Sequence, residues 1–506
     1  MDRSTKELTV LPQSECQADS PFAVLLASFH QTGITYCYWR SSRRVEVALA
    51  GDSDLDLLVA KEDQYRAWQN LLQSGFKYFS AVAYRNHPAI YSFLGYDEQS
   101  GRIVHVHLHV RLVIGGALLK THRIHWEDVI LARTVWHPTL PIRILDPTDE
   151  ALLTYVRACL ELRRTDPVAL HRWGTLKQKF AMDQDALTAR LDRATLLQRS
   201  CEIFSHELAG VVTEALLGES TLVAKRRLTL RIRKELGSWR TCGLVEGHAG
   251  TATRAVLSAA GKLNVSIFHR FRPWRRLAPG GGCVAALVGV DGSGKTTVMN
   301  AIRAWLEPEV DVVRIYFGTG GGRPSLLLLP LKMMLPLVTA CIRTKPRSSS
   351  HGRVSNRAPG PVYSVLMMVW ATVLSVEKRT KLLAAWRGAE RGLIVLADRF
   401  PQDEEPTYND APLLSRLTWA PRQLRAFEAR SYGLARRLPP DLVIRLDVSV
   451  GTAAKREPDM AQTLIRDRIA ALRRLTFSGA RVVCVDADRP LDEVLRAVKR
   501  EIWQLL

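Results

Sequence analysis

A predicted strand, a glycine-rich turn and a predicted helix follow one another directly in the second half of the chain. The apolar run CVAALVGV (283–290) predicts a buried strand, and DGSGKTTVMNAIRAWL (291–306) predicts a turn that enters a helix. Four residues match the pattern G-x-x-x-x-G-K-[ST] in the structural context that it requires, namely Gly289, Gly294, Lys295 and Thr296. This feature constrains the fold more than any other and predicts an α/β unit with a phosphate-binding loop.

The residue types of this loop suit a nucleotide. Glycines let backbone N–H groups close around phosphates, and the N-terminus of the following helix favours negative charge. Lys295 would neutralise the β and γ phosphates, and Thr296 would offer a hydroxyl to Mg²⁺, which bridges those phosphates. We therefore expect ATP and Mg²⁺ as cofactors, bound by Gly289, Asp291, Gly292, Ser293, Gly294, Lys295, Thr296 and Thr297.

The sequence GVDGSGKTT (289–297) resembles the corresponding loop of thymidylate kinases more than that of other P-loop proteins. LIVLADRF (393–400) resembles the strand of that family that ends in Asp-Arg-aromatic. The resemblance implies that Asp398 lies near Mg²⁺ and that Arg399 holds the phosphates between donor and acceptor. An Asp-Arg pair after a strand is also often a surface turn.

Two further segments are similar to the same family. DLVIRLDVSVGTAAKREPD (441–459) resembles its next strand and its arginine-bearing lid, which makes Lys455 and Arg456 candidates for charge stabilisation, although lid arginines are often solvated helix charges. The segment 481–506 predicts a strand, a turn and a closing amphipathic helix, as that family finishes. The resemblance covers residues 283–506. It implies Mg²⁺ ligation by Thr296 and Asp398 and catalysis by Lys295, Asp398, Arg399 and Arg456.

The acceptor substrate is not indicated. After Asp-Arg-aromatic, thymidylate kinases carry a Ser and an Ala-Tyr-Gln-like stretch that shapes the thymine pocket, whereas PQDEEPTYNDAPLL (401–414) follows here. A long apolar and basic insertion, 324–376, also departs from that family. These differences make dTMP a weak candidate.

An acidic pair marks the N-terminal part. GDSDLDLLV (51–59) places Asp54 and Asp56 on one face of a predicted strand, as two-metal chemistry requires, and resembles nucleotidyltransferase-like domains. The resemblance implies a preceding Gly-Ser pair and a third carboxylate, but YWRSS (38–42) lacks the glycine and IVHVHLHV (103–110) supplies histidines instead. Those histidines, which are His105, His107 and His109, share one face of a strand and would either bind a metal or form a polar exposed face.

The 506 residues exceed what one hydrophobic core usually supports. We expect α/β folding throughout, with a nucleotidyltransferase-like domain (21–145), a helical region and basic linker (146–280), and a P-loop kinase domain with a parallel sheet flanked by helices (281–506). The eight cysteines show no C-x-x-C spacing, and the N-terminus shows no secretory signal. Both features predict a cytoplasmic protein.

The charge distribution suggests an anionic partner. The formal net charge is +21, and residues 220–280 hold a large excess of Lys and Arg over acidic residues. This stretch is either a solvated helix face with a hinge or a surface for an anionic membrane or polyanion; no nucleic-acid motif accompanies it. The apolar segments 325–342 and 361–376 predict buried helices or a membrane-touching insertion rather than spans.

These observations favour an ATP-dependent phosphotransferase of the nucleoside monophosphate kinase type, which moves the γ-phosphoryl of MgATP to a phosphate or hydroxyl acceptor. Two alternatives remain open. One is an ATP-binding regulatory module at a membrane or a glycan-synthesis complex. The other is a nucleotidyltransferase with an accessory P-loop domain.

Overall fold

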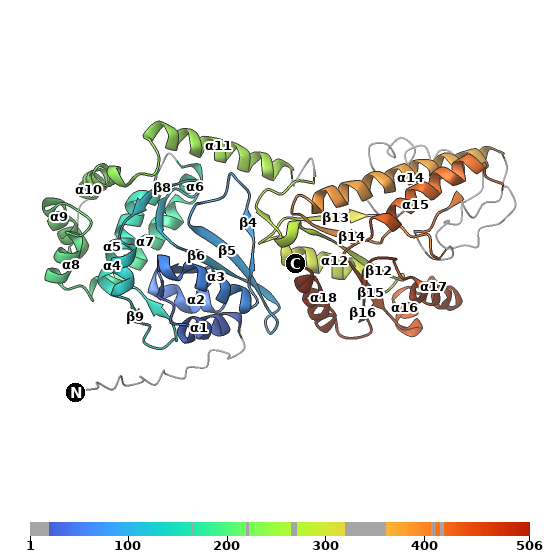
Figure 1. Cartoon of the computed structure of the whole chain (residues 1–506), viewed down its shortest axis with the longest axis horizontal. Coiled ribbons are helices and arrows are strands. Elements are labelled where there is room, and N and C mark those ends of the chain that lie inside the picture. Colours follow the sequence, from blue (N-terminus) through green and yellow to red (C-terminus); the bar gives the residue numbers. More distant parts are fainter. Residues whose placement is uncertain are drawn as a thin grey trace. The chain divides into compact units, whose positions relative to one another are not determined.

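The computed structural model describes residues 20–163, 166–218, 222–264, 271–318, 361–405, 408, 410–414 and 419–506. Contacts divide the chain into two compact units, Met1–His269 and Arg270–Leu506, which we call the first and second unit (Figure 1). The apolar segment 325–342 and nearly all of the basic loop 343–361 lie outside the described residues.

A mixed sheet organises the first unit. Its strand order is β3-β5-β6-β2-β1-β10-β9. The central strand β2 runs parallel to β6 and antiparallel to β1, and every residue of β1 and β2 is buried. Such continuous burial means that both faces of the sheet are covered. The first unit has the strands β1 (Tyr36–Tyr38), β2 (Leu55–Val59), β3 (Lys77–Tyr78), β4 (Ser80–Ala81), β5 (Ile90–Asp97), β6 (Arg102–His109), β7 (Leu112–Gly115), β8 (Lys120–Ile124), β9 (Val135–Trp136) and β10 (Arg143–Ile144). Of these, β4, β7 and β8 lie outside the mixed sheet.

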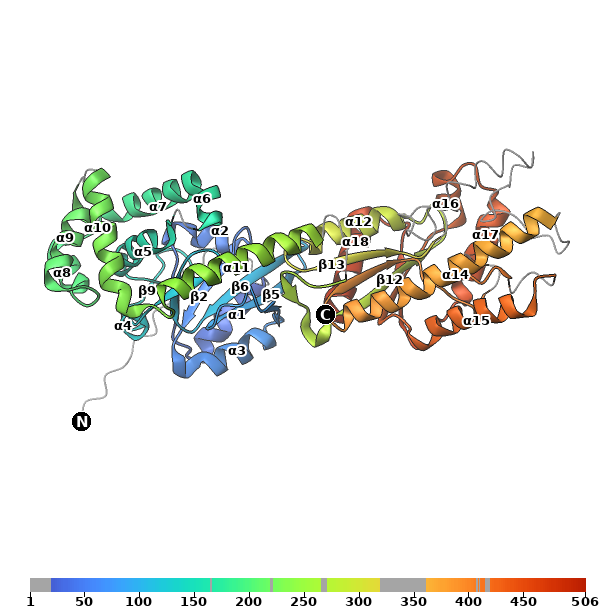
Figure 2. The ribbon, with the colours of Figure 1, turned by 90° about the horizontal axis from the view of Figure 1, so that it is seen from above.

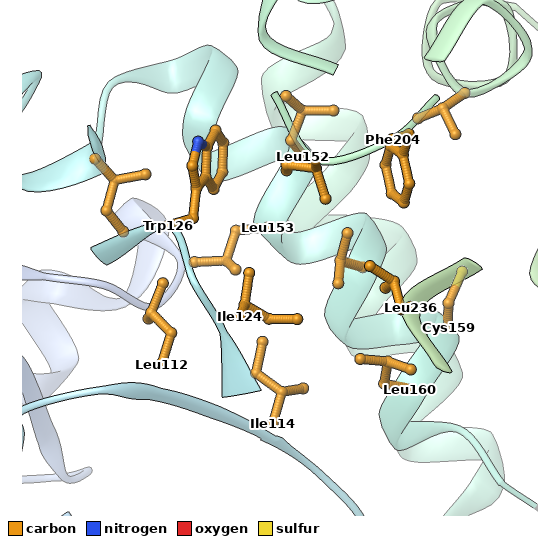
Figure 3. Packing of buried hydrophobic residues seen from close by; sticks show 14 of the residues in the cluster. Leu112, Ile114, Ile124, Trp126, Leu152, Leu153, Cys159, Leu160, Phe204 and Leu236 are labelled. Atoms are coloured by element: carbon orange, nitrogen blue, oxygen red, sulfur yellow. The ribbon is translucent and has the colours of Figure 1, made fainter. Parts of the chain in front are cut away.

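Two hydrophobic cores flank this sheet. One lies under α1, α2 and α3; the other joins the β7–β8 hairpin to α5, α8, α9 and α10, and Figure 3 shows Ile124, Trp126 and Leu153 from it. The helices of this unit are α1 (Pro21–Gln31), α2 (Val45–Leu49), α3 (Gln64–Gln73), α4 (Glu127–Ala132), α5 (Pro147–Glu161), α6 (Pro167–His171), α7 (Trp173–Thr188), α8 (Arg193–Ser200), α9 (His206–Leu217), α10 (Leu222–Glu235) and α11 (Leu244–Leu263).

The basic stretch 220–280 is folded where the structure describes it. Leu228 and Ile232 of α10 lie in the core shown in Figure 3, and the Arg233 guanidinium donates to the backbone oxygens of Cys159 and Leu162 at 2.7 and 2.8 Å. The part of the predicted helical region and basic linker that forms α10 is therefore a helix packed against the hydrophobic core. This helix uses part of its positive charge to pack against α5.

A parallel sheet organises the second unit. Its order is β13-β14-β12-β15-β16, and all four pairings are parallel. Because parallel strands buried on both faces read as continuous apolar runs, the sequence located β12 and β14 closely. The strands are β11 (Arg276–Leu277), β12 (Cys283–Gly289), β13 (Val312–Tyr316), β14 (Ile394–Asp398), β15 (Leu442–Asp447) and β16 (Arg481–Asp486).

Helices cover both faces of this sheet. In Figure 1, α12 and α18 lie on one face and α14 with α15 on the other; Figure 2 also shows α14 and α15 side by side. The predicted α/β class with helices flanking a parallel sheet is confirmed. The helices are α12 (Lys295–Leu306), α14 (Pro361–Ala389), α15 (Arg422–Arg437), α16 (Val450–Arg456), α17 (Gln462–Arg474) and α18 (Leu491–Leu505).

The apolar segment 361–376 forms the first part of α14. A buried ammonium, that of Lys378, follows in the same helix and donates to the Tyr432 hydroxyl of α15 at 2.8 Å. Among the residues that the structure describes, no helix has the length and apolar character to cross a membrane.

Truncating a side chain in the core that joins the β7–β8 hairpin to α5 should selectively destabilise the first unit. Leu153 is 1% exposed, so we expect Leu153→Ala to lower the free energy of unfolding of this unit by about 2–5 kcal/mol. Hydrogen exchange of peptides from residues 20–264 in rising urea measures it. The control Val245→Ala, at a side chain 84% exposed, should change this free energy by less than about 0.5 kcal/mol. Equal effects of the two substitutions would contradict this assignment of the core.

Candidate functional site

A cavity of about 600 Å³ opens beside the loop between β12 and α12. β12 is the central strand, and the chain crosses to β13 and β14 on one side and to β15 and β16 on the other. Ligands of open α/β sheets bind at the carboxyl ends of the strands where the strand order reverses in this way. The lining residues include Asp291, Gly292, Ser293, Gly294, Lys295, Thr296, Thr297, Arg314, Tyr316, Asp398, Arg399, Arg456 and Arg489.

Glycines shape the loop itself. Gly292 and Gly294 have φ values of +79° and +84°, which L side chains adopt only at a cost. A Cβ on Gly292 would also lie 3.0 Å from the backbone oxygen of Ala453 in α16. A Cβ on Gly289 would lie 2.4 Å from the Ser293 hydroxyl oxygen, so the end of β12 is equally restricted. The pattern therefore places glycine where the backbone needs it.

Lys295 is the buried cation of the cavity. Its ammonium donates to the backbone oxygen of Val290 at 2.6 Å, so the side chain curls back over its own loop. Burial, followed by the positive charge of Arg399, lowers the pKa of Lys295 to about 8. The hydroxyl-bearing side chains of Thr296 and Thr297 are exposed and line the cavity. The loop thus presents one ammonium and two hydroxyls to a ligand.

Asp291 ties the loop to two other elements. Its carboxylate accepts a hydrogen bond from Arg399, at the end of β14, at 3.3 Å, and another from the buried Arg468 of α17. Arg399 also lies 3.7 Å from the Asp410 carboxylate. Although burial opposes the charged form, Asp410 is the largest influence that raises the pKa of Arg399. Arg399 is consequently a fixed cation at the cavity wall.

The backbone of Arg399 is strained. Its φ is +67°, a left-handed conformation that few non-glycine residues adopt, and its N–H donates to the backbone oxygen of Leu287 at 3.0 Å. Such strain is found most often at functional sites, where the surrounding structure enforces it. The Asp-Arg pair of this chain is therefore a constrained feature of the cavity rather than a free surface turn.

Asp398 is a buried carboxylate in the lining of the cavity. It is 3% exposed, and Arg314 of β13 donates to its carboxylate at 2.5 Å. Arg314 also donates to the side-chain oxygen of Asn300 at 3.0 Å. The structure thus brings the predicted Asp398 to the cavity together with an arginine that the sequence did not single out.

Of the two candidates in the segment 441–459, Lys455 and Arg456, only Arg456 lines the cavity. Arg456 lines the cavity and donates to the backbone oxygens of Gly292 and Ala487 at 3.1 and 3.3 Å, whereas the exposed Lys455 is not among the lining residues. Because Arg456 is hydrogen-bonded to the loop, its guanidinium lies where it would contact a ligand bound there.

Sequence reasoning missed several contributors to this site. Tyr408 donates from its hydroxyl to the backbone oxygen of Gly289 at 2.8 Å, and Asp410 pairs with Arg399. Both belong to the stretch 401–414, which differed from the thymidylate kinase pattern and carried no recognisable signal. Arg314 and Arg468 gave no signal either, since only the sheet order and α17 bring them to the loop.

A second cluster of functional groups lies in the first unit, where β2 pairs with β6. Asp56 lies opposite His107 in the register of these strands. His105 Nδ1 is 2.8 Å from the Asp54 carboxylate, and His109 Nε2 is 3.0 Å from that of Asp56. His105 and His109 are 6% and 1% exposed, so the alternative of a polar exposed strand face is wrong.

The serines before this strand do not contact the acidic pair. The Ser42 N–H donates to the Glu150 carboxylate at 2.8 Å, and Ser41 is buried. Burial raises the pKa of Glu150 to about 7, although the hydrogen bonds from Ser42 lower it. YWRSS therefore anchors the start of α5 to the sheet.

The fold and the loop between β12 and α12 define a P-loop type of α/β protein. No family model matches the chain. It is 30% identical over 228 residues to the uncharacterized ATP-binding protein YghS of Escherichia coli (strain K12), which is 44% of this chain and 93% of YghS. It is also 27% identical over 226 residues to the uncharacterized ATP-binding protein YghR of the same strain, covering 43% of this chain and 85% of YghR.

The chain belongs to the same family as YghS. The printed names of both relatives describe ATP binding by those proteins. Each match covers less than half of this chain.

Substitution of Gly292 should disturb the loop where it meets α16. We expect Gly292→Ala to lower the free energy of unfolding of the second unit by about 1–3 kcal/mol, because the alanine would need a positive φ and would press against Ala453. Denaturant-dependent hydrogen exchange of peptides from this unit measures it. In the control, Gly451→Ala in α16, the new methyl meets nothing within 4 Å and should not destabilise the unit. Loss of stability in the control alone would contradict the described loop.

Proposed function

We propose that the second unit binds ATP and transfers its γ-phosphoryl group to an acceptor, as a thymidylate kinase-like phosphotransferase. One observation carries this proposal: Lys295, Arg399 and Arg456 reach one cavity from three separate segments, around a loop in which Gly292 and Gly294 have positive φ values. Membership of a family whose named relatives are ATP-binding proteins supports the nucleotide. The resemblance of GVDGSGKTT and LIVLADRF to thymidylate kinases supports the kinase type.

The charge of the cavity suits a triphosphate. Among the lining residues, the cations Lys295, Arg314, Arg399, Arg456 and Arg489 outnumber the acidic residues. A polyphosphate would replace the Val290 oxygen as the partner of the Lys295 ammonium. Because Lys295 is 8% exposed, its attraction for the phosphates would be weakly screened by solvent.

The residues present also fit a magnesium ion. Thr296 would supply its exposed hydroxyl and Asp398 its carboxylate, both at the cavity. Magnesium would neutralise charge that develops on the phosphates. Since Arg314 pairs with Asp398, we infer that Arg314 balances the charge of this carboxylate when it has no other partner.

The arginines would act by position and charge. Arg399 is held on the cavity wall by Asp291 and Asp410, so it would meet a transferring phosphoryl group with little reorganisation. Arg456 bonds to the loop through Gly292 and would stabilise charge from the lid side. The mechanism is in-line transfer to a phosphate or hydroxyl oxygen, promoted by orientation and electrostatics.

Transfer from labelled ATP tests the proposal. The full-length protein with Mg²⁺ is incubated with nucleoside monophosphates, sugars and polyprenyl phosphates as separate acceptors. We expect label in one acceptor class and a loss of at least about 100-fold in Lys295→Ala, because a buried cation aimed at the phosphates is removed. The control Lys455→Ala changes an exposed lysine outside the cavity and should remain close to wild type.

Two outcomes oppose the kinase. ATP binding with no labelled acceptor would favour the regulatory module. Transfer of label from ATP labelled in its α-phosphate that survives in Lys295→Ala but disappears in Asp54→Ala would favour a nucleotidyltransferase with an accessory P-loop domain.

ATP affinity should depend on pH through Lys295. Its pKa of about 8 without nucleotide means that the ammonium is charged below this pH and neutral above it. Phosphates favour the charged form, so we expect the Kd for MgATP to rise up to about tenfold per pH unit above pH 8. Calorimetric titration between pH 7 and 9.5 measures it. Lys295→Gln should bind more weakly with a flatter profile, and a constant Kd in the wild type would contradict this role.

A further inference from the structure

The strand pair β2–β6 gathers imidazole and carboxylate groups in the first unit. One oxygen of Asp54 and one ring nitrogen each of His105 and His107 lie within 4.8 Å of one another. We propose that these three side chains bind one divalent transition-metal ion, with Zn²⁺ as the best fit. The proposal does not depend on the phosphotransferase function, since all three ligands belong to the first unit.

The three groups combine fixed and accessible donors. The side chain of His105 is 5% exposed, whereas those of Asp54 and His107 are 48% and 22% exposed. His105 Nδ1 lies 2.8 Å and His107 Nδ1 lies 3.6 Å from the two Asp54 oxygens. An ion can therefore reach the group from solvent, and its remaining coordination positions would face the open side of Asp54.

Metal binding would use the ring nitrogens that now face the carboxylate. A neutral histidine ligand needs an unprotonated Nδ1, with its proton on Nε2. The ion would take the place of a proton shared between Nδ1 and Asp54, and each neutral imidazole would then carry its proton on Nε2. The negative charge of Asp54 would attract the ion into the space between the three side chains. The two strands would not have to rearrange.

Neighbouring residues hold this group in place. Asp56 lies 3.4 Å from His107 Nδ1 and accepts from Arg40 Nε at 3.1 Å. His109 bonds to the same carboxylate and packs against Trp39, with ring centroids 4.9 Å apart. These contacts fix Asp56 and His109 beside the three ligands. Asp56 faces the same Nδ1 of His107 that would bind the ion, so this carboxylate is a direct neighbour of the proposed ion and not a contact to the second ring nitrogen.

The arrangement fits poorly with the two-magnesium site that the nucleotidyltransferase resemblance implies. That chemistry needs several carboxylates free to coordinate. Here the position on β6 opposite Asp56 is His107, so β6 offers an imidazole where a further carboxylate would be needed. Magnesium prefers oxygen ligands, whereas a set of two imidazoles and one carboxylate with open positions suits zinc and related ions.

Cobalt titration of the full-length protein without nucleotide tests the site. Co²⁺ reports its ligands through visible d–d absorption, and Zn²⁺ should displace it. We expect one equivalent to bind without the near-ultraviolet charge-transfer band of a thiolate ligand, which separates this site from the exposed Cys201 and Cys484. Asp54→Asn and His107→Ala should each weaken binding by at least about 10–100-fold.

The matched control is His206→Ala, which removes an exposed histidine of α9 and should bind Co²⁺ like the wild type. Circular dichroism confirms folding of each variant, and Asp54→Asn is the safer one because Asp54 is about half exposed. Absence of stoichiometric binding, or binding unchanged in both ligand variants, would overturn the proposal and leave a self-contained hydrogen-bond network.

Discussion

The parallel pairing of β12 with β14 and β15 is the constraint on which the cavity depends. Parallel strands end on the same edge of a sheet, so residues far apart in sequence meet there. This edge brings the phosphate loop beside Asp398 and Arg399, while α16 and α17 follow from β15. Without this strand order, Lys295 would lie at the start of α12 without Arg399 and Arg456 in the same cavity.

Both clusters of polar groups obey the same rule for buried charge. In the second unit, Asp291 is bonded to Arg399 and Arg468; in the first, Asp56 is bonded to Arg40 and His109. Removing one partner of such a pair would leave the other charge without compensation in a partly desolvated position. These pairs fix the geometry of the neighbouring groups that remain accessible. The paired acids fix the geometry of each site. More exposed groups, such as the Thr296 hydroxyl and the Asp54 carboxylate, face the solvent.

The sequence predicted the parts of the fold that local patterns encode. The phosphate loop was evident because glycines, Lys295 and a buried strand occur together at fixed spacing, and the histidines of β6 were evident because a strand alternates its faces. Arg314 and Arg468 were not predictable, since their contacts depend on strand order and on helix docking. The packing of the basic helix α10 was not predictable either, because Arg233 donates to backbone oxygens in α5 and directly after it, which composition cannot show.

Hydrogen exchange with and without MgATP tests the central claim most directly, namely that the cavity of the second unit is the nucleotide site. We predict slower exchange concentrated in peptides that cover residues 289–299 and α16 around Arg456, with little change in β2 and β6 of the first unit. Protection confined to the first unit, or no protection at saturating nucleotide, would contradict it.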